Sequence, residues 1–400
     1  MTRSVYVVSA EPSGDALAVD LIAHLRRLDP DLRLHAIGGP AVEGLGFASA
    51  IDTAPLSVLG FTEGLRALPQ VQELSMRAVQ DIVREGPDLV VLIDSWGFMI
   101  RVAKLLRISP WNGAVVKYVA PQVWAMRQGR AKLLAKFTDL LLTLYPFDAP
   151  YFVRHGLRTD HVGNPVLDLD HASGDGPAFR ARHHISALDP LLLVAFGSRA
   201  SEVERLTPDF VATIERLRAR RPGLAVVGLT VPETRAQLAA KLFELGAAGR
   251  SVMLVDEGEK LDAMAASDIA LAKSGTVTTQ LADAGVPTLV AYRVSALTYF
   301  FAKRLFKADY VSIVNVAANT ALMPEFIQGD IDPETMAERL DGWLSHPVEA
   351  KRLSAALREV TDGMRGEGGA GERAALAVLR ELDARKPSFK AIGEGKLARG

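Results

Sequence analysis

One carboxylate stands directly after a strongly apolar run of the sequence. Residues 89–93 read Leu-Val-Val-Leu-Ile, and Asp94 follows them. A short apolar run without alternation is typical of a strand buried on both faces of a parallel sheet. Open α/β sheets bind ligands at the carboxyl ends of their strands, so a carboxylate there can accept a proton from a substrate hydroxyl. Asp94 also suits a second role, as the cap of the helix expected after it, and one residue can do both.

Three other turns combine small residues with groups that suit an anion. They read Glu-Pro-Ser-Gly-Asp at 11–15, Gly-Ser-Arg at 197–199 and Lys-Ser-Gly-Thr at 273–276. Each lies between an expected strand and an expected helix, where free backbone N–H groups attract phosphate. Arg199 adds a guanidinium whose fork matches phosphate oxygens. The two turns of the second half together predict a diphosphate site, although each alone also fits an ordinary connection between a strand and a capped helix.

The segment from Ser95 to Thr138 is basic, because it contains no Asp or Glu. Its cations are Arg101, Lys104, Arg107, Lys117, Arg127, Arg130, Lys132 and Lys136. Two of them, Arg127 and Arg130, follow the apolar turn that contains Trp124. Such a surface suits a phosphorylated lipid or an anionic bilayer. Two alternatives stay open: a nucleic-acid surface, and a solvated helix face whose charge is balanced by acids elsewhere in the fold.

Composition and missing motifs exclude several classes of function. The chain has no cysteine, which excludes a disulfide framework, a Cys-ligated metal and a thiol nucleophile. Its eight histidines show no H-x-x-x-H pair, and the dinucleotide, P-loop and G-x-S-x-G motifs are missing, so we expect no metal site and no cofactor. A net charge of −1 argues against a nucleic-acid partner. No apolar run approaches the roughly 18 residues that span a bilayer, and no signal peptide is recognisable.

Short β-branched runs alternate with helical patterns along the 400 residues, which predicts an α/β fold with parallel sheets. Strands are expected at 5–9, 88–93, 114–119, 139–144, 191–196, 224–229, 251–255, 268–272 and 288–291. The polar segment 169–177 separates two halves. We expect two Rossmann-like, doubly wound domains, at 1–168 and 178–365, that face each other across a cleft. A C-terminal helix and a loose tail follow at 366–400, and the helix packs either on the first domain or on a partner.

In their order along the chain, these motifs resemble the lipid-A-disaccharide synthase family of inverting glycosyltransferases, which have the two-domain GT-B fold. The resemblance covers residues 4–385. Its specific pieces are Tyr-Val-Ala-Pro-Gln-Val-Trp-Ala at 118–125 and Pro-Glu-Phe-Ile-Gln at 324–328. Further matching segments are 11–15, 56–63, 93–95, 146–147, 162–163, 197–199, 274–276, 292–293 and Asn315.

The resemblance implies transfer of a sugar from UDP-2,3-diacylglucosamine to 2,3-diacylglucosamine 1-phosphate. The implied products are a β-1,6-linked lipid A disaccharide 1-phosphate and UDP, formed with inversion and without a metal. Asp94 is the implied catalytic base in an acceptor-binding first domain. The expected donor-side residues, in a UDP-binding second domain, are Arg199, Ser274, Gly275, Thr276, Gln280, Asn315, Glu325 and Gln328. The expected residues of the phosphate and acceptor cleft are Ser13, Gly14, Trp124, Arg127 and Arg130.

The resemblance also bears on location and partners. It implies a cytoplasmic protein bound peripherally to the inner face of the bacterial inner membrane, to which the basic segment would draw it. Members of the family can dimerise through the C-terminal region, so a homodimer is compatible with the sequence.

The sequence departs from the family pattern near the expected donor and acceptor sites. Gln280 replaces a glutamate that can bind ribose hydroxyls, and Asn164 replaces a histidine. Trp96-Gly97, Ala195-Phe196 and Ala10 are further departures. The alternatives are therefore a related UDP-sugar glycosyltransferase with another donor or acceptor, and a catalytically silent nucleotide-sugar-binding protein. A UDP-N-acetylglucosamine 2-epimerase and the peptidoglycan glucosaminyltransferase are disfavoured by the motifs around Trp124 and at 324–328.

Overall fold

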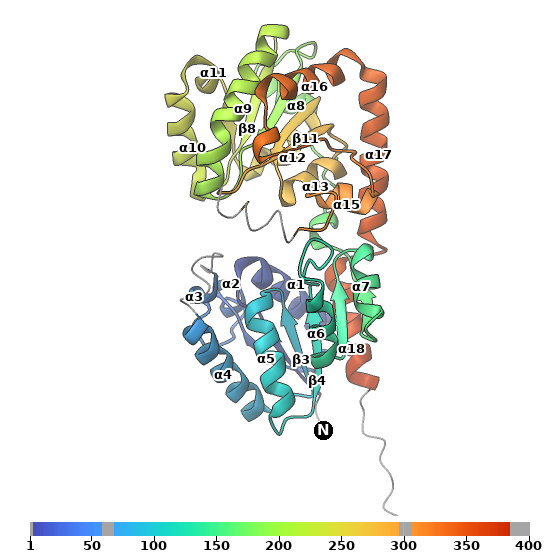
Figure 1. Cartoon of the computed structure of the whole chain (residues 1–400). Helices are drawn as coiled ribbons and strands as arrows, with labels where there is room; N and C mark the ends of the chain where they lie inside the picture. The colour runs from blue at the N-terminus through green and yellow to red at the C-terminus, as the bar shows by residue number, and fades with distance from the viewer. Residues whose placement is uncertain (1–2, 58–67, 296–298, 300–305, 385–400) are drawn as a thin grey trace, which may run out of the picture.

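A computed structural model of the chain describes residues 3–57, 68–295, 299 and 306–384. It contains two parallel six-stranded sheets, one in each half of the chain, with helices on both faces of each (Figure 1). The predicted α/β architecture of two Rossmann-like domains is confirmed. The expected tail beyond residue 385 and residues 58–63 of the 56–63 motif lie outside the described residues.

The first sheet has the strand order β2-β1-β3-β4-β5-β6. Its strands are β1 (Ser4–Val8), β2 (Arg33–Ile37), β3 (Leu89–Ile93), β4 (Ala114–Tyr118), β5 (Leu140–Thr143) and β6 (Arg158–His161). The inner strands β1, β3 and β4 are buried along their whole length, as their apolar sequences predict. One face packs on α1 (Pro12–Leu28) and α18 (Ala370–Ala384), and the other on α4 (Leu68–Glu85) and α5 (Trp96–Ile108).

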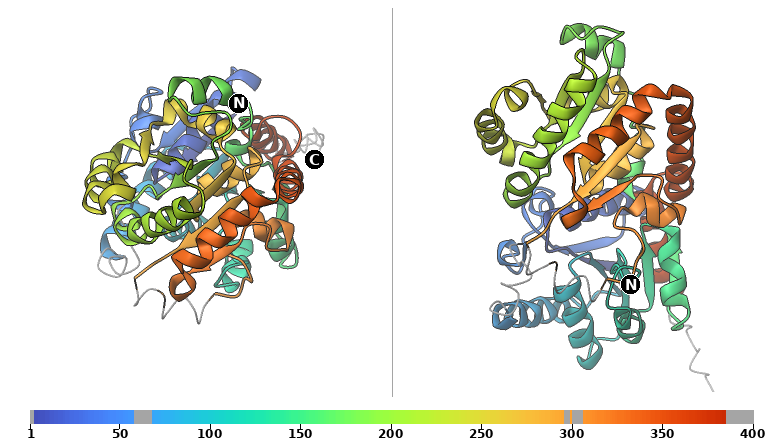
Figure 2. Two further views of the ribbon diagram at one scale, coloured as in Figure 1. Left: turned by 90° about the horizontal axis from the view of Figure 1, so that it is seen from above. Right: turned by 45° about the horizontal axis from the view of Figure 1, so that its top comes forward.

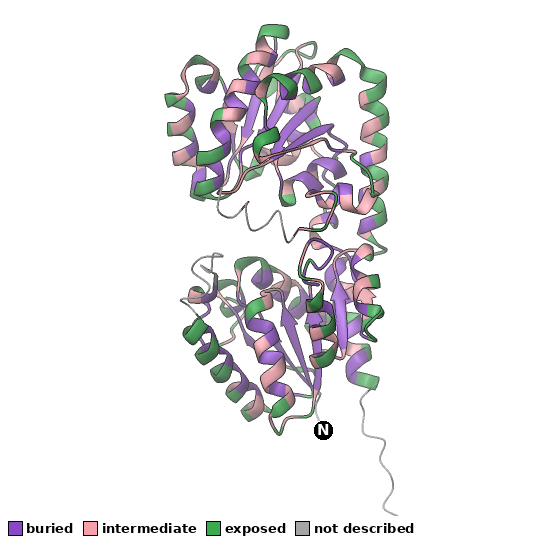
Figure 3. Cartoon of the chain, viewed as in Figure 1, coloured by how far each residue is buried: buried purple, intermediate pink, exposed green. Residues whose placement is uncertain are grey.

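The second sheet has the order β12-β11-β10-β7-β8-β9. Its strands are β7 (Leu191–Ala195), β8 (Ala225–Leu229), β9 (Met253–Val255), β10 (Ile269–Lys273), β11 (Thr288–Tyr292) and β12 (Glu325–Ile327). Helices α9 (Ala200–Arg220), α10 (Pro232–Glu244) and α16 (Pro333–Ser345) cover one face. Helices α8 (Gly176–Arg182), α12 (Lys260–Ala266) and α13 (Thr276–Asp283) cover the other. Figure 3 shows both sheets as buried layers between helices with exposed outer faces.

Seven further helices and four single-turn pieces complete the described secondary structure around these layers. They are α2 (Pro40–Glu43), α3 (Ala54–Ser57), α6 (Gly129–Phe137), α7 (Ala149–Val153), α11 (Gly246–Arg250), α15 (Ile313–Ala318) and α17 (Pro347–Arg365), with the single-turn pieces at Pro146–Asp148, Pro165–Leu167, Glu257–Glu259 and Gln328–Asp330. Among the described residues, no helix is long and apolar enough to cross a membrane. The same residues contain no group of three or more His, Asp or Glu side chains that could hold a metal ion.

The chain returns to the first domain at its C-terminal end. Helix α17 runs along the second domain, and α18 then packs beside α1 of the first (Figures 1 and 2). Its buried residues Ala374 and Val378 belong to the same apolar core as β1 and β3. The C-terminal helix α18 therefore packs on the first domain of its own chain.

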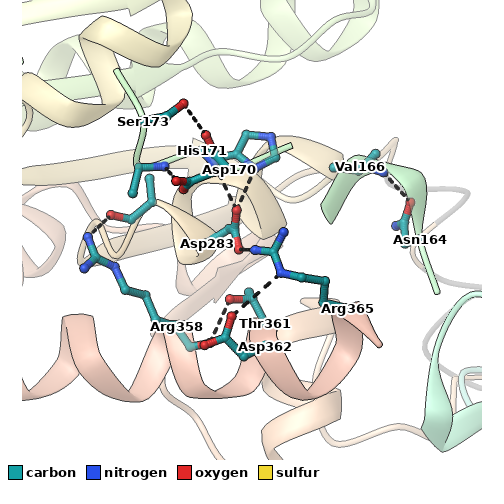
Figure 4. A network of polar contacts seen from close by, with 12 residues as sticks. Asn164, Val166, Asp170, His171, Ser173, Asp283, Arg358, Thr361, Asp362 and Arg365 are labelled. Carbon is teal, nitrogen blue, oxygen red and sulfur yellow. Dashed lines mark hydrogen bonds and ion pairs between the residues drawn. The ribbon is translucent and has the colours of Figure 1, made fainter. Parts of the chain in front are cut away.

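A buried polar network ties the second domain to the two chain segments that connect the domains (Figure 4). Asp283, the last residue of α13, accepts hydrogen bonds from the backbone N–H and ring Nδ1 of His171, at 3.2 and 2.8 Å. The guanidinium of Arg365, at the end of α17, pairs with the other oxygen of Asp283. Both Asp283 and His171 are buried. Helix α13 therefore links the turn at its start to the domain connections at its end.

Candidate active site

Asp94 and the first β-α turn meet at the carboxyl end of the first sheet. The hydroxyl of Ser13 donates a 2.9 Å hydrogen bond to Oδ2 of Asp94. A Cβ on Gly14 would lie 3.5 Å from the Cβ of Asp94. Asp94 and Ser95 both have positive φ, 51° and 32°, so the chain makes a sharp turn between β3 and α5. Such backbone is sparsely populated by non-glycine residues and is found at functional sites, where the surrounding structure enforces it.

Two further charged residues, Lys117 and Glu11, interact electrostatically with Asp94. The ammonium of Lys117, on the inner strand β4, is 2 % exposed and donates to the Tyr118 carbonyl at 2.7 Å. Burial lowers the pKa of Lys117 to about 7, although the charges of Asp94 and Glu11 act in the opposite direction. A lysine inside the apolar run 114–119 was the available signal for it.

Glu11 connects the two domains electrostatically. Burial raises the pKa of Glu11, and a hydrogen bond from Ser95 and the positive charges of Arg199 and Lys117 oppose that rise. Arg199 stands in the second domain, directly before α9, and its side chain is 76 % exposed. The positive charge of Arg199 in the second domain therefore acts on the Glu11 carboxylate of the first domain.

The two predicted anion-binding turns of the second domain line one cavity of about 240 Å³. Its lining residues are Ala195, Gly197, Ser198, Leu229, Thr230, Val231, Glu257, Lys260, Lys273, Gly275, Thr276, Val277 and Gln280. Thr276 is the first residue of α13, whose free N–H groups open toward this cavity. Gln280, one turn further along α13, lies in the same lining, and its contact with a nucleotide stays a prediction.

Glu202 and Lys273 join these two turns. Oε2 of Glu202 accepts the backbone N–H groups of Ser198 and Arg199 at 3.1 and 3.3 Å. Oε1 of Glu202 lies 2.8 Å from Nζ of Lys273. Burial by itself raises the pKa of Glu202, but Lys273 outweighs it and the pKa falls below its ordinary value. Gly197 has φ of 118°, and a Cβ there would come within 2.7 Å of the Glu202 Cβ, so this turn requires glycine.

Three other residues expected on the donor side hold a neighbouring segment together. Glu325 accepts the backbone N–H groups of Val311 and Ser312, each at 2.8 Å, and the amide of Asn315 at 2.8 Å. Asn315 is fully buried and also bonds the backbone of Met323 in both directions. The side-chain amide of Gln328 pairs with the backbone N–H and carbonyl of Val294. These three residues do not line the 240 Å³ cavity, and their contact with UDP stays a prediction.

The aromatic and basic residues expected at the acceptor cleft lie beside the helix that follows Asp94. Arg130 stacks over the ring of Trp96, the first residue of α5, at 5.1 Å. Burial and the nearby charge of Arg127 both lower the pKa of Arg130. Trp124 is buried and packs edge-to-face on Phe147, with ring centroids 6.0 Å apart. Trp124 therefore shapes the turn, while Arg127 and Arg130 carry its positive charge.

A second cavity of about 460 Å³ opens beside Glu11 in the first domain. It lies between the first β-α turn and the turn after β2, at Gly38 and Gly39. Asp15 holds these turns together, because its Oδ1 accepts the Ser9 hydroxyl at 2.5 Å and the Gly39 N–H at 2.9 Å. The first domain thus has space next to the Asp94 turn, on the side that faces the second domain.

Comparison with known proteins agrees with this arrangement. A sequence model of the lipid-A-disaccharide synthetase family matches residues 5–372. The lipid-A-disaccharide synthase of Rhodospirillum centenum is 38% identical over 386 residues, 95% of each chain. That of Paramagnetospirillum magneticum is 39% identical over 380 residues, 94% of this chain and 96% of the relative.

Solved structures show the same fold at low sequence identity. A putative UDP-N-acetylglucosamine 2-epimerase from Listeria monocytogenes superposes with a TM-score of 0.63 at 12% identity, over 96% of this chain and 98% of the epimerase. MurG from Acinetobacter baumannii superposes with a TM-score of 0.57 at 14% identity, over 94% and 99% of the two chains. These structures share the two-domain GT-B fold, and the family match makes the chain a UDP-sugar glycosyltransferase of that fold. By its sequence, the chain belongs to the lipid-A-disaccharide synthase family.

Proposed function

We propose that this chain transfers 2,3-diacylglucosamine from UDP to 2,3-diacylglucosamine 1-phosphate and releases UDP and the β-1,6 disaccharide 1-phosphate. The observation that carries the proposal is the pairing of two sites. A cavity lined by two anion-binding turns stands in the second domain, and Asp94 stands with Ser13 at the facing end of the first. Membership in the lipid-A-disaccharide synthase family along 5–372 supports this choice of the two sugars.

On the donor side, the diphosphate binds at the start of α13 and at the turn before α9. Gly275 and Thr276 present backbone N–H groups, and Arg199 presents its guanidinium from the facing turn, whereas the backbone N–H of Ser274 donates to the Ala291 carbonyl. Negative charge grows on the departing diphosphate as the sugar C1–O bond breaks, and preorganised donors stabilise that charge. The proposal assigns this task to the chain's own groups and requires no metal ion.

On the acceptor side, Asp94 takes the proton of the sugar 6-hydroxyl. The hydroxyl oxygen attacks C1 from the face opposite the diphosphate, so a new C1–O6 bond forms as the old bond breaks and the configuration inverts. The hydrogen bond from Ser13 fixes one oxygen of Asp94. The other oxygen of Asp94 is thereby available to the 6-hydroxyl of the acceptor sugar, as a general base requires.

The basic surface that α5 and α6 form on the first domain suits the anionic face of a membrane. Lys104 of α5 and Lys136 of α6 both lie over the ring of Phe137, at 5.7 and 5.5 Å. Ile108, at the end of α5, is 80 % exposed. A cluster of cations next to an exposed apolar side chain binds anionic lipid surfaces. We therefore assign the protein to the cytoplasmic face of the inner membrane, where both acylated sugars are accessible.

Product analysis tests the proposed reaction. Purified protein in detergent micelles, with EDTA present, receives UDP-2,3-diacylglucosamine with and without 2,3-diacylglucosamine 1-phosphate. We expect UDP release that depends on the acceptor, and a disaccharide 1-phosphate in the mass spectrum. Binding of UDP without product, beside an active control synthase, would refute this function. It would favour a silent binding protein, whereas product from another acceptor sugar would favour a related transferase.

A further inference from the structure

Lys273 is not among the eight residues expected on the donor side, but it lies inside the donor cavity. Lys273 is the last residue of β10, and its side chain is 13 % exposed. Its Nζ would be 3.6 Å from a Cβ on Gly275, so the ammonium lies over the start of α13. The same Nζ stands 5.5 Å from the ring centroid of Tyr292, which shields one side of it.

The carboxylate of Glu202 fixes this ammonium between the two anion-binding turns. One oxygen of Glu202 holds Lys273 and the other holds the N–H groups of the Gly197–Arg199 turn, as described above. An ammonium has three N–H donors, and a single carboxylate oxygen takes one of them. The remaining donors lie in a cavity that the start of α13 already makes attractive to an anion.

We propose that Lys273 is a cation of the diphosphate site, with Glu202 as the residue that positions it. The inference rests on the proposed function and deepens it, because it assigns a second positive charge, beside that of Arg199, to the departing nucleoside diphosphate. Glu202 leaves the local charge balanced before the nucleotide binds. When the diphosphate binds, Lys273 bridges Glu202 and a phosphate oxygen, so the charge that develops on the leaving group is met without movement of the backbone.

The test compares the affinities of UDP and uridine, because the two ligands differ in the diphosphate alone. Lys273→Met and Lys273→Gln are measured by calorimetry for UDP and by ligand-observed NMR for uridine. Loss of a charge-assisted hydrogen bond weakens UDP binding about tenfold to a hundredfold. Uridine binding should stay within about twofold of the wild type, since the nucleoside does not reach the ammonium.

Lys241→Met is the matched control. Lys241 is also a lysine paired with a glutamate, Glu204, in the same domain, but it does not line the cavity. This variant should bind both ligands as the wild type does. Lys273→Arg, which keeps the charge, should recover most of the UDP affinity and confirm that charge is the cause.

The possible results separate the role of Lys273 from the proposed function of the protein. Equal losses of UDP and uridine binding in both Lys273 variants would make the residue structural and overturn the inference, as would unchanged UDP binding. A wild-type protein that binds neither ligand would contradict the proposed function itself. An equal loss of UDP affinity in Lys241→Met and in the Lys273 variants would show a general effect of charge and would also overturn the inference.

Discussion

The hydroxyl of Ser13 and the carboxylate of Asp94, 81 positions apart in the sequence, are joined by a 2.9 Å hydrogen bond at the end of the first sheet. The parallel register of β1 and β3 brings them together, because Val8 pairs with Leu92 and both strands then end at the same edge. The bond gives Asp94 one oxygen that is occupied by the protein and one that is available to a substrate.

Removal of this bond should slow the chemical step. Ser13→Ala leaves Asp94 in place but frees its orientation, so we expect kcat to fall about tenfold with little change in KM, in line with a hydrogen bond to a charged group. Steady-state kinetics measure both constants. Ser354→Ala is the control, since the Ser354 hydroxyl bonds the Ala350 carbonyl of its own helix α17. A rise of KM at constant kcat in Ser13→Ala would contradict the positioning role.

The buried Lys117 should make stability depend on alkaline pH. Its pKa is about 7 in the folded protein, whereas the unfolded chain retains an ordinary lysine pKa of about 10.4. Between these values the unfolded state binds more protons, so the free energy of unfolding rises with pH by about 1.4 kcal/mol per unit. The loss of unfolding free energy that results from burying the charged Lys117 is fully present below pH 7 and disappears above pH 10.

Denaturant unfolding of the wild type and Lys117→Met at pH 6.5, 8 and 9.5 measures this difference. The methionine variant should be more stable than the wild type at pH 6.5, and the gap should close as the pH rises. Parallel dependences in the two proteins would show that Lys117 keeps an ordinary pKa. Lys351→Met, on the exposed surface of α17, gives the reference for a lysine in water.

The buried Asp283 should hold the domain connection together. Burial raises its pKa, but the hydrogen bonds from His171 and the charge of Arg365 outweigh that effect and lower the pKa. Asp283→Asn removes one partner of a buried pair and should lower the free energy of unfolding by about 3 kcal/mol. Because the folded-state pKa is the lower one, this contribution is present above about pH 4 and is lost as the pH falls below it.

Asp362→Asn is the matched control for the domain connection. Asp362 lies 3.8 Å from the same arginine, Arg365, but its side chain is 72 % exposed. A surface pair of this kind contributes less than about 1 kcal/mol. Denaturant unfolding at pH 7 and pH 3.5 compares the two variants. An equal effect of both substitutions at pH 7 would show that the buried network does not stabilise the protein.

Gln280 offers a direct test of the donor site, because it lines the cavity at a position where the family resemblance implies a glutamate. A carboxylate accepts hydrogen bonds from ribose hydroxyls more strongly than an amide oxygen does. Gln280→Glu should therefore bind UDP about threefold to tenfold more tightly. The gain should vanish with 2′,3′-dideoxy-UDP, measured by the same titration. A gain that persists with the dideoxy nucleotide would place Gln280 away from the ribose.

The central strands and the turns after them were predictable, because fully buried strands are uniformly apolar. The edge strands β2 and β6 were not, since Arg33–Ile37 and Arg158–His161 carry polar residues where one side of the strand meets solvent. The sequence also placed Asp94 and the second-domain turns correctly at strand ends. Their partners Lys117 and Glu202 depend on register and helix phase, which bring distant residues together only in three dimensions.

The residues at 315–328 illustrate a different limit. A motif can be specific to a family through either ligand contact or packing, and the sequence does not separate the two. In the structure, Asn315 bonds the backbone of Met323, and Glu325 accepts the backbone N–H groups of Val311 and Ser312. Their role in shaping the segment is therefore visible. Arg199 is exposed and its charge opposes the rise that burial causes in the pKa of Glu11, but its contact with UDP stays a prediction.

The most direct measurement compares single-turnover product formation with UDP affinity in Asp94→Asn, beside Asp31→Asn on an exposed turn of the same domain. Loss of a general base should slow product formation about a hundredfold to ten-thousandfold, while UDP affinity stays within about twofold. Asp31→Asn should match the wild type in both. Product formation by Asp94→Asn at the wild-type rate, with substrates saturating, would contradict the assignment of Asp94 as the base.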